Sequence, residues 1–69
     1  MIYIFKTSVK TKSQVKKLKP PIDKILPKGK WNFDLEDIDN ILRIDSEEDI
    51  VLKIIRLLNI YEFSCEELE

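Results

Sequence analysis

Residues 31–45, with the sequence WNFDLEDIDNILRID, are the most informative stretch for the fold of this chain. Large apolar side chains alternate with polar ones over residues 31–36, and the alternation returns over residues 41–45. A period of two is typical of strands that bury one face. Turn-forming residues lie between the two runs, at residues 37–40. The stretch therefore predicts an antiparallel hairpin.

The alternation also predicts which residues oppose each other in this hairpin, since each strand has only one apolar face. The expected pairs are Leu35 with Leu42, Phe33 with Ile44, and Asp34 with Arg43. The first two pairs would point into the core. The charged pair would lie on the other face, where opposite charges stabilise by a few tenths to about 1 kcal/mol.

Upstream of the hairpin, the sequence predicts a strand followed by a helix. Residues 2–7 are β-branched and aromatic and contain no turn residue, which is typical of a strand. The apolar residues that follow have helical spacing, with Ser13 as the expected N-cap. They are Val15, Leu18, Ile22 and Ile25. Pro20 and Pro21 interrupt this stripe, so we expect a kinked or two-piece helix that ends near residues 27–29.

Downstream of the hairpin, a second helix and a last strand are expected. Ser46 and Asp49 have the spacing of a capping box, which predicts the helix start. The apolar stripe of this helix consists of Val51, Ile54, Ile55 and Leu58. Asn59 is expected to help end the helix, and residues 63–68 predict a short final strand.

The order strand, helix, strand, strand, helix, strand predicts an α+β fold of the ferredoxin-like βαββαβ type. In this fold, two helices cover one face of a four-stranded antiparallel sheet, and the first and third strands are central. No repeat or linker divides the sequence, so residues 1–69 are expected to form a single domain.

The composition limits how such a small domain is stabilised. A chain of 69 residues buries only about 60% of the surface that it exposes when unfolded. Cys65 is the only cysteine and there is no histidine, so neither an internal disulfide nor a closed zinc site of Cys and His ligands is expected. A partner is the remaining source of extra stability.

Charge is unevenly distributed along the sequence, although the net charge is only −1. Residues 1–30 contain nine lysines and one acid, and residues 31–69 contain twelve acids and three basic residues. The two kinds of charge either interleave on the surface or form a bipolar surface suited to head-to-tail association. The apolar run of residues 1–5 is too short for a signal peptide or a membrane span. We therefore expect a cytoplasmic protein that does not bind membranes.

In length, element order and a first strand that runs into a polar loop, the chain resembles the heavy-metal-associated domain family. The closing pattern is also similar, with an amphipathic helix leading to Phe63-Ser64-Cys65. The resemblance covers nearly the whole chain. It implies a ferredoxin-like fold of the kind used by copper chaperones and by modules of metal-transporting ATPases.

The metal-binding motif of that family is absent from this sequence. Family members carry a Met followed closely by C-x-x-C in the first loop, where two thiolates bind a soft metal ion. With Val9 in place of the Met, the cysteine positions fall on Thr11 and Gln14. A glycine usually found near the last strand is also replaced, by Glu62. The resemblance therefore implies a member without a metal ion or other cofactor.

Two groups of residues have ligands for metals, and we expect neither to form a metal site. Cys65 offers one soft ligand near the loop after the first strand, but free cysteines are usually small buried residues. The acidic residues around the hairpin lack the glycine and the distal glutamate of an EF-hand. They are Asp34, Glu36, Asp37 and Asp39.

The aromatic residues do not indicate a nucleic-acid surface. RNA-recognition domains share this fold and stack bases on aromatic residues of the two central strands. Tyr3 and Phe5 are instead expected to face the helices, and the third strand has no aromatic residue. Trp31 is expected to be a core anchor at the edge of the sheet. We therefore expect no nucleic-acid binding.

No catalytic residues are recognisable, because the chain has no histidine, no Gly-rich phosphate loop and no nucleophile elbow. The leading interpretation is a non-enzymatic module that binds an unknown protein partner or itself. A weak homodimer would use an apolar patch of Ile2, Ile4 and Ile41 on the open face of the sheet. The alternative is a copper- or zinc-handling protein that shares a metal ion through Cys65 across a dimer.

Overall fold

The four predicted strands form one antiparallel sheet in the computed structural model, which describes residues 1–27, 30–36 and 38–68. In chain order they are β1 (Ile2–Thr7), β2 (Lys30–Asp34), β3 (Ile41–Asp45) and β4 (Cys65–Leu68). Across the sheet their order is β2-β3-β1-β4, and every neighbouring pair is antiparallel. The prediction that the first and third strands are central is therefore confirmed.

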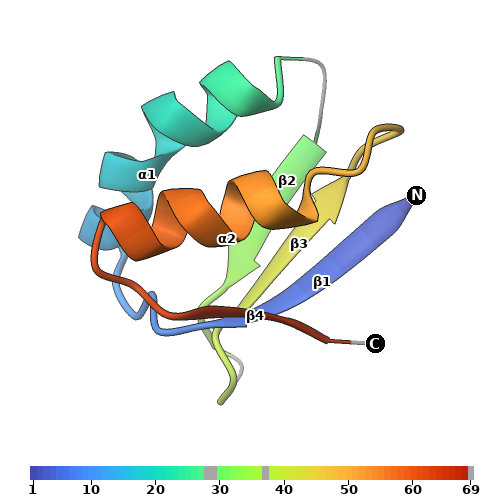
Figure 1. Cartoon of the computed structure of the whole chain (residues 1–69). Helices are drawn as coiled ribbons and strands as arrows, with labels where there is room; N and C mark the ends of the chain where they lie inside the picture. The colour runs from blue at the N-terminus through green and yellow to red at the C-terminus, as the bar shows by residue number, and fades with distance from the viewer. Residues whose placement is uncertain (28–29, 37, 69) are drawn as a thin grey trace.

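Two helices, α1 (Lys12–Ile25) and α2 (Val51–Ile60), cover the same face of this sheet (Figure 1). The fold is thus the α+β, ferredoxin-like βαββαβ fold that the order of elements predicted. Among the described residues, no helix has both the length and the apolar character needed to cross a membrane.

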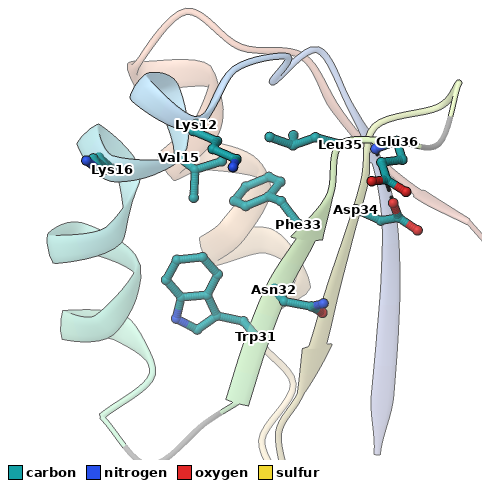
Figure 2. A pocket seen from close by; sticks show the side chains of 9 residues that line it. All are labelled: Lys12, Val15, Lys16, Trp31, Asn32, Phe33, Asp34, Leu35 and Glu36. Atoms are coloured by element: carbon teal, nitrogen blue, oxygen red, sulfur yellow. Dashed lines mark hydrogen bonds between the residues drawn. The ribbon is translucent and has the colours of Figure 1, made fainter.

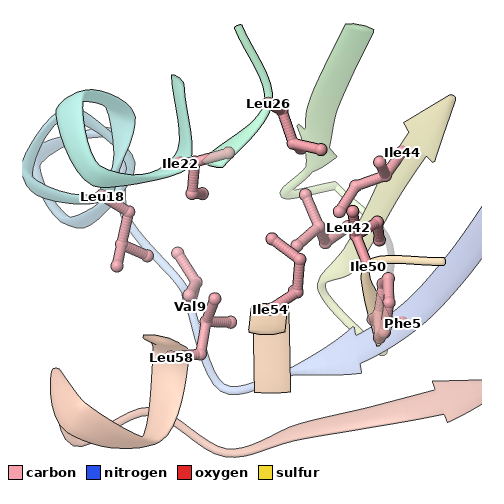
Figure 3. Close-up of a cluster of buried hydrophobic side chains, with 10 residues drawn as sticks. All are labelled: Phe5, Val9, Leu18, Ile22, Leu26, Leu42, Ile44, Ile50, Ile54 and Leu58. Atoms are coloured by element: carbon pink, nitrogen blue, oxygen red, sulfur yellow. The ribbon is translucent and has the colours of Figure 1, made fainter. Parts of the chain in front are cut away.

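The core lies between the helices and the sheet, where side chains from both layers meet (Figure 3). Its buried residues are Phe5, Val9, Leu18, Ile22, Leu26, Leu42, Ile44, Ile50, Ile54 and Leu58. The two helical stripes and the apolar parity of the strands had predicted most of them. Thr7 is a buried polar residue at the end of β1. Its hydroxyl donates to the Asn40 carbonyl at 2.7 Å and accepts from the Val9 amide at 3.2 Å.

The register of the β2–β3 hairpin differs from the predicted register by two residues. Phe33 lies opposite Leu42 and Asn32 lies opposite Arg43, so the predicted pairing of Asp34 with Arg43 was wrong. Leu35 lies beyond the end of β2, in the turn. A shift of two residues leaves every side chain on its predicted face, so the alternation could not distinguish the two registers.

Helix α1 begins two residues earlier than an N-cap at Ser13 would require, because its N-cap is Thr11. The Thr11 hydroxyl accepts from the Gln14 amide at 3.1 Å, and Gln14 Oε1 accepts from the Thr11 amide at 3.2 Å. This reciprocal pair is a capping box, which satisfies two backbone donors that the helix leaves free. The prediction of Ser13 as the N-cap was therefore wrong.

Pro20 and Pro21 both lie inside α1, which continues past them as one element. Of the predicted kinked or two-piece helix, the two-piece form was therefore wrong. Each proline lacks the amide that would donate to the carbonyl four residues earlier, a loss that usually interrupts a helix. Here Leu18 and Ile22 are fully buried on either side of the prolines, and their packing offsets this loss. The helix ends at Ile25, slightly before the predicted end, and residues 28–29 lie outside the described residues.

Helix α2 begins later than the capping-box spacing predicted. The Ser46 hydroxyl accepts from the Glu48 amide at 3.2 Å, and Asp49 Oδ1 accepts from the Val51 amide at 3.2 Å. These bonds form turns before the helix, and the N-cap residue, Ile50, has no side-chain cap. The predicted start was therefore wrong, because short polar side chains can bond to nearby amides in turns as well as in caps.

The connection from α2 to β4 contains a residue with an unfavourable backbone conformation. Glu62 has φ 70°, in the left-handed region that favours glycine. Asn59 Nδ2 donates to the Phe63 carbonyl at 3.3 Å, so Asn59 helps to close this turn as predicted. Strand β4 begins at Cys65 rather than at Phe63.

Candidate functional site

Trp31 lies on the edge strand β2, where it is half-buried against the core cluster, as predicted for an anchor at the edge of the sheet. Its indole Nε1 donates to Asp23 Oδ1 on α1 at 2.9 Å. Its ring also contacts Phe33 edge to face, with 5.9 Å between the ring centroids. The hydrogen bond and the ring contact hold the indole in one orientation between β2 and α1.

A groove of about 560 Å³ runs between α1 and β2, and Trp31 and Phe33 form its floor (Figure 2). Both rings point from the strand toward the helix. The residues that line it are Lys12, Val15, Lys16, Trp31, Asn32, Phe33, Asp34, Leu35 and Glu36. Its volume is within the range of about 300–1,000 Å³ that is usual for binding sites. The aromatic floor makes the groove apolar inside, and the charged residues among those that line it make its rim polar.

The helical rim of this groove is basic. Lys12 and Lys16 lie one turn apart on α1, and neither forms an ion pair with a residue that the structure describes. One turn further on, Lys19 Nζ lies 5.8 Å from the Trp31 ring centroid and 3.3 Å from Asp23 Oδ2, with which it forms an ion pair. The hydrogen bond from Trp31 lowers the pKa of Asp23, and Lys19 lowers it further. Asp23 thus pairs with Lys19, while Lys12 and Lys16 have no ion-pair partner in the described part of the chain.

The acidic lining residues lie at the far end of the groove. Figure 2 shows the carboxylates of Asp34 and Glu36 directed away from α1. Asp34 Oδ1 accepts from the Glu36 amide at 3.2 Å, which holds this carboxylate in the turn after β2. The lysines on the opposite rim are thus not neutralised across the groove.

The groove lies beside a free edge of the sheet. Within the described part of the chain, β2 pairs only with β3, so its outer edge has no strand partner. Backbone donors and acceptors on such an edge are available to a further strand. A chain segment that entered the groove could therefore also pair with β2.

Sequence reasoning did not predict this groove. The spacing of Lys12, Lys16 and Lys19 on one side of a helix was available as a signal. The strand that lies beside this helix, and the position of that strand at an edge, are set by contacts between distant segments. The sequence pattern could not show them.

Cys65 lies where the sequence placed it, at the start of β4 and beside the loop after β1. It is opposite Thr7 in the sheet, and the Ser8 amide donates to the neighbouring Ser64 carbonyl at 3.2 Å. Its side chain is half-buried and packs against the core. Burial raises the pKa of the thiol from 9.0 to about 12. The environment therefore disfavours the thiolate that a soft metal ion would require.

Cys65 is expected to react slowly with iodoacetamide in the folded protein. Raising the pKa from 9.0 to about 12 lowers the thiolate fraction at neutral pH about a thousandfold. The rate measured by mass spectrometry should rise steeply between pH 9 and 12. Denatured protein at the same pH is the control. Equal rates in the folded and denatured states at pH 8 would show that Cys65 is not buried and that its pKa is not raised.

The acidic residues around the hairpin do not gather into a site. Asp34 accepts a hydrogen bond from the turn, and Asp39 pairs with Lys6 at 3.6 Å, while Asp37 lies outside the described residues. Among the residues that the structure describes, no three Asp, Glu, Cys or His side chains are grouped to hold a metal ion.

The open face of the sheet is less apolar than the sequence suggested. Tyr3 and Phe5 point toward the helices, as predicted. Ile2 is 60% exposed, but Ile4 is half-buried and Ile41 is only 7% exposed. The predicted contribution of Ile41 to an exposed patch was therefore wrong. Only Ile2 and part of Ile4 remain of that patch.

No protein-family model matches this chain, and no curated protein or solved structure is significantly similar to it.

Proposed function

We propose that this chain is a non-enzymatic protein-interaction module that binds an extended peptide segment in the groove between α1 and β2. The observation that carries the proposal is an apolar groove directly beside a sheet edge that no strand of the described residues covers. Domains that bind peptides by strand addition use this combination, since the sheet edge supplies backbone hydrogen bonds and the groove receives alternate side chains. The aromatic floor also supplies a large apolar contact area.

We also propose that the fold is related to heavy-metal-associated domains and has lost the metal site. Two features of the structure support the relationship. Thr11 and Gln14, at the positions of the missing cysteines, meet at the N-terminus of α1. Glu62, at the position of the missing glycine, has the positive φ that favours glycine. The raised pKa of Cys65 supports loss of the metal site over metal binding through this thiol.

Selection of peptides from a phage-displayed random library tests the interaction module. Synthetic copies of the selected peptides, made without tryptophan, should change the fluorescence of Trp31, which is the only tryptophan in the chain. In NMR spectra, the amides that shift should belong to α1 and β2. Shifts confined to Ile2, Ile4 and Leu68 on the open face of the sheet would contradict this location, and a selection without binders would contradict the function.

Backbone methylation of a selected peptide tests strand addition. A methyl group on alternate peptide nitrogens removes the donors that would pair with β2. Methylation of one alternate set should abolish binding, and methylation of the other set should be tolerated, because only one set points toward the sheet edge. Unchanged affinity with either set methylated would contradict strand addition.

A further inference from the structure

We infer that the segment bound in this groove is acidic and belongs to another protein. This inference rests on the function proposed above and specifies its ligand. Its basis is the charge of the groove, where Lys12 and Lys16 line the helical rim without ion-pair partners among the described residues. Figure 2 shows the Lys12 side chain directed toward Phe33 and the Lys16 side chain directed away from β2. Long carboxylate side chains on a bound strand would therefore meet Lys12 first, with Lys16 adding positive charge to the same rim, while smaller apolar side chains would contact the aromatic floor.

Charge complementarity at such a rim selects the ligand more than it raises affinity. A wrong charge placed against the two lysines is repelled, and a matching charge speeds association. The carboxylates of Asp34 and Glu36 point away from α1 at the far end. They disfavour a ligand of uniform negative charge, such as a nucleic-acid backbone, and favour a segment whose acids are limited to the α1 side.

A second copy of this chain fits the groove less well than another protein. Its β4 edge is acidic, but the residues that β4 directs toward the helix layer are Cys65 and Glu67, opposite Thr7 and Phe5. Neither supplies a large apolar side chain for the aromatic floor.

The helix above β4 also opposes self-association at this site. Helix α2 lies beside β4 and exposes Lys53 and Arg56. Adding β4 of one copy to β2 of the next would bring α2 of the first copy, with these two exposed cations, next to α1 of the second copy. Positive charge on both helices would disfavour this contact. We therefore infer that the occupant is a segment from a different protein and not β4 of a second copy.

Three peptides of identical length test the charge of the ligand. The first repeats the unit valine-threonine-glutamate-threonine, which places valine and glutamate on one side of a strand. The other two replace glutamate with glutamine or with lysine. The glutamate peptide should bind about tenfold more tightly than the glutamine peptide, as measured by Trp31 fluorescence. The lysine peptide should bind most weakly.

Charge reversal on the protein should exchange this preference. Lys12→Glu with Lys16→Glu should weaken binding of the glutamate peptide about tenfold or more and strengthen binding of the lysine peptide. The matched control is Lys17→Glu with Lys24→Glu, which changes the net charge equally on exposed positions of the same helix that do not line the groove. The control should leave the preference unchanged. Circular dichroism verifies that both variants fold.

Each contrary result overturns the inference in a recognisable way. Equal binding of all three peptides, with the fluorescence change retained, would leave the groove as a peptide site and remove its preference for acids. Sedimentation that showed an oligomer disrupted by Lys12→Glu with Lys16→Glu would identify a second copy as the occupant. Displacement of the glutamate peptide by single-stranded RNA at lower concentrations would identify a nucleic-acid site.

Discussion

Thr11→Cys together with Gln14→Cys is expected to create a copper(I) site at the start of α1, in a protein whose own residues provide none there. Thr11 and Gln14 already contact each other through the capping box, at 3.1 and 3.2 Å, so both side chains point to the same end of the helix. The helix N-terminus lowers thiol pKa values and favours thiolates, which are the preferred ligands of copper(I). Pro20 and Pro21 do not displace the helix start, which immediately follows Thr11.

Competition with a copper(I) chelator under anaerobic conditions measures this effect. The double variant should retain copper(I) at chelator concentrations that strip it from each single variant. Loss of the N-cap should cost about 1 kcal/mol of folding stability, so circular dichroism is recorded alongside. Equal weak binding by the double and single variants would show that the two positions do not converge, and would remove the main support for a lost metal site.

Leu58→Ala is expected to remove a large part of the free energy that keeps this protein folded at room temperature. Leu58 is fully buried in α2, and truncating such a side chain costs about 2–5 kcal/mol, through lost burial and the cavity left behind. A domain of 69 residues has a total stability of about 3–10 kcal/mol. The substitution therefore removes much of the margin that keeps this small core folded. Urea unfolding followed by circular dichroism measures the change.

Leu52→Ala is the matched control, since it makes the same chemical change on the same helix. Leu52 is 66% exposed, so its truncation should alter the free energy of unfolding by less than about 0.5 kcal/mol. A similar loss of stability in both variants would mean that α2 does not pack on the sheet through the face that contains Leu58. It would then contradict the arrangement of the core.

The order of the elements and the face that each one buries follow from the amino-acid sequence alone. Side chains alternate along a strand and recur every three or four residues along a helix, so apolar spacing identifies the buried face without knowledge of any partner. Phe5, Leu42 and Ile44 on the strands, and Ile22 and Ile54 on the helices, are buried for this reason. Four strands and two helices in this order then left few alternatives to the ferredoxin-like arrangement.

The register of the hairpin and the starts of the helices depend instead on how the elements pack together. Pairings of Leu42 with Leu35 or with Phe33 are equivalent in parity, and β3 must also pair Leu42 with Phe5 on its other side. Several polar residues near each helix start can serve as N-caps. The side chains of Ser46 and Asp49 instead accept hydrogen bonds in turns that precede α2. Local sequence rules do not rank such alternatives, because the free-energy differences depend on how neighbouring elements pack.

The groove is also a product of the tertiary structure. Lys12 and Lys16 lie in the first half of α1, and the rest of that helix and the connection after it separate them from Trp31 and Phe33 in the sequence. The sheet edge beside the groove exists only because β2 is last in the order of the described strands. Spacing along the chain determines which side chains share a face of one element. It does not determine which elements become neighbours, since that choice belongs to the packing of the whole domain.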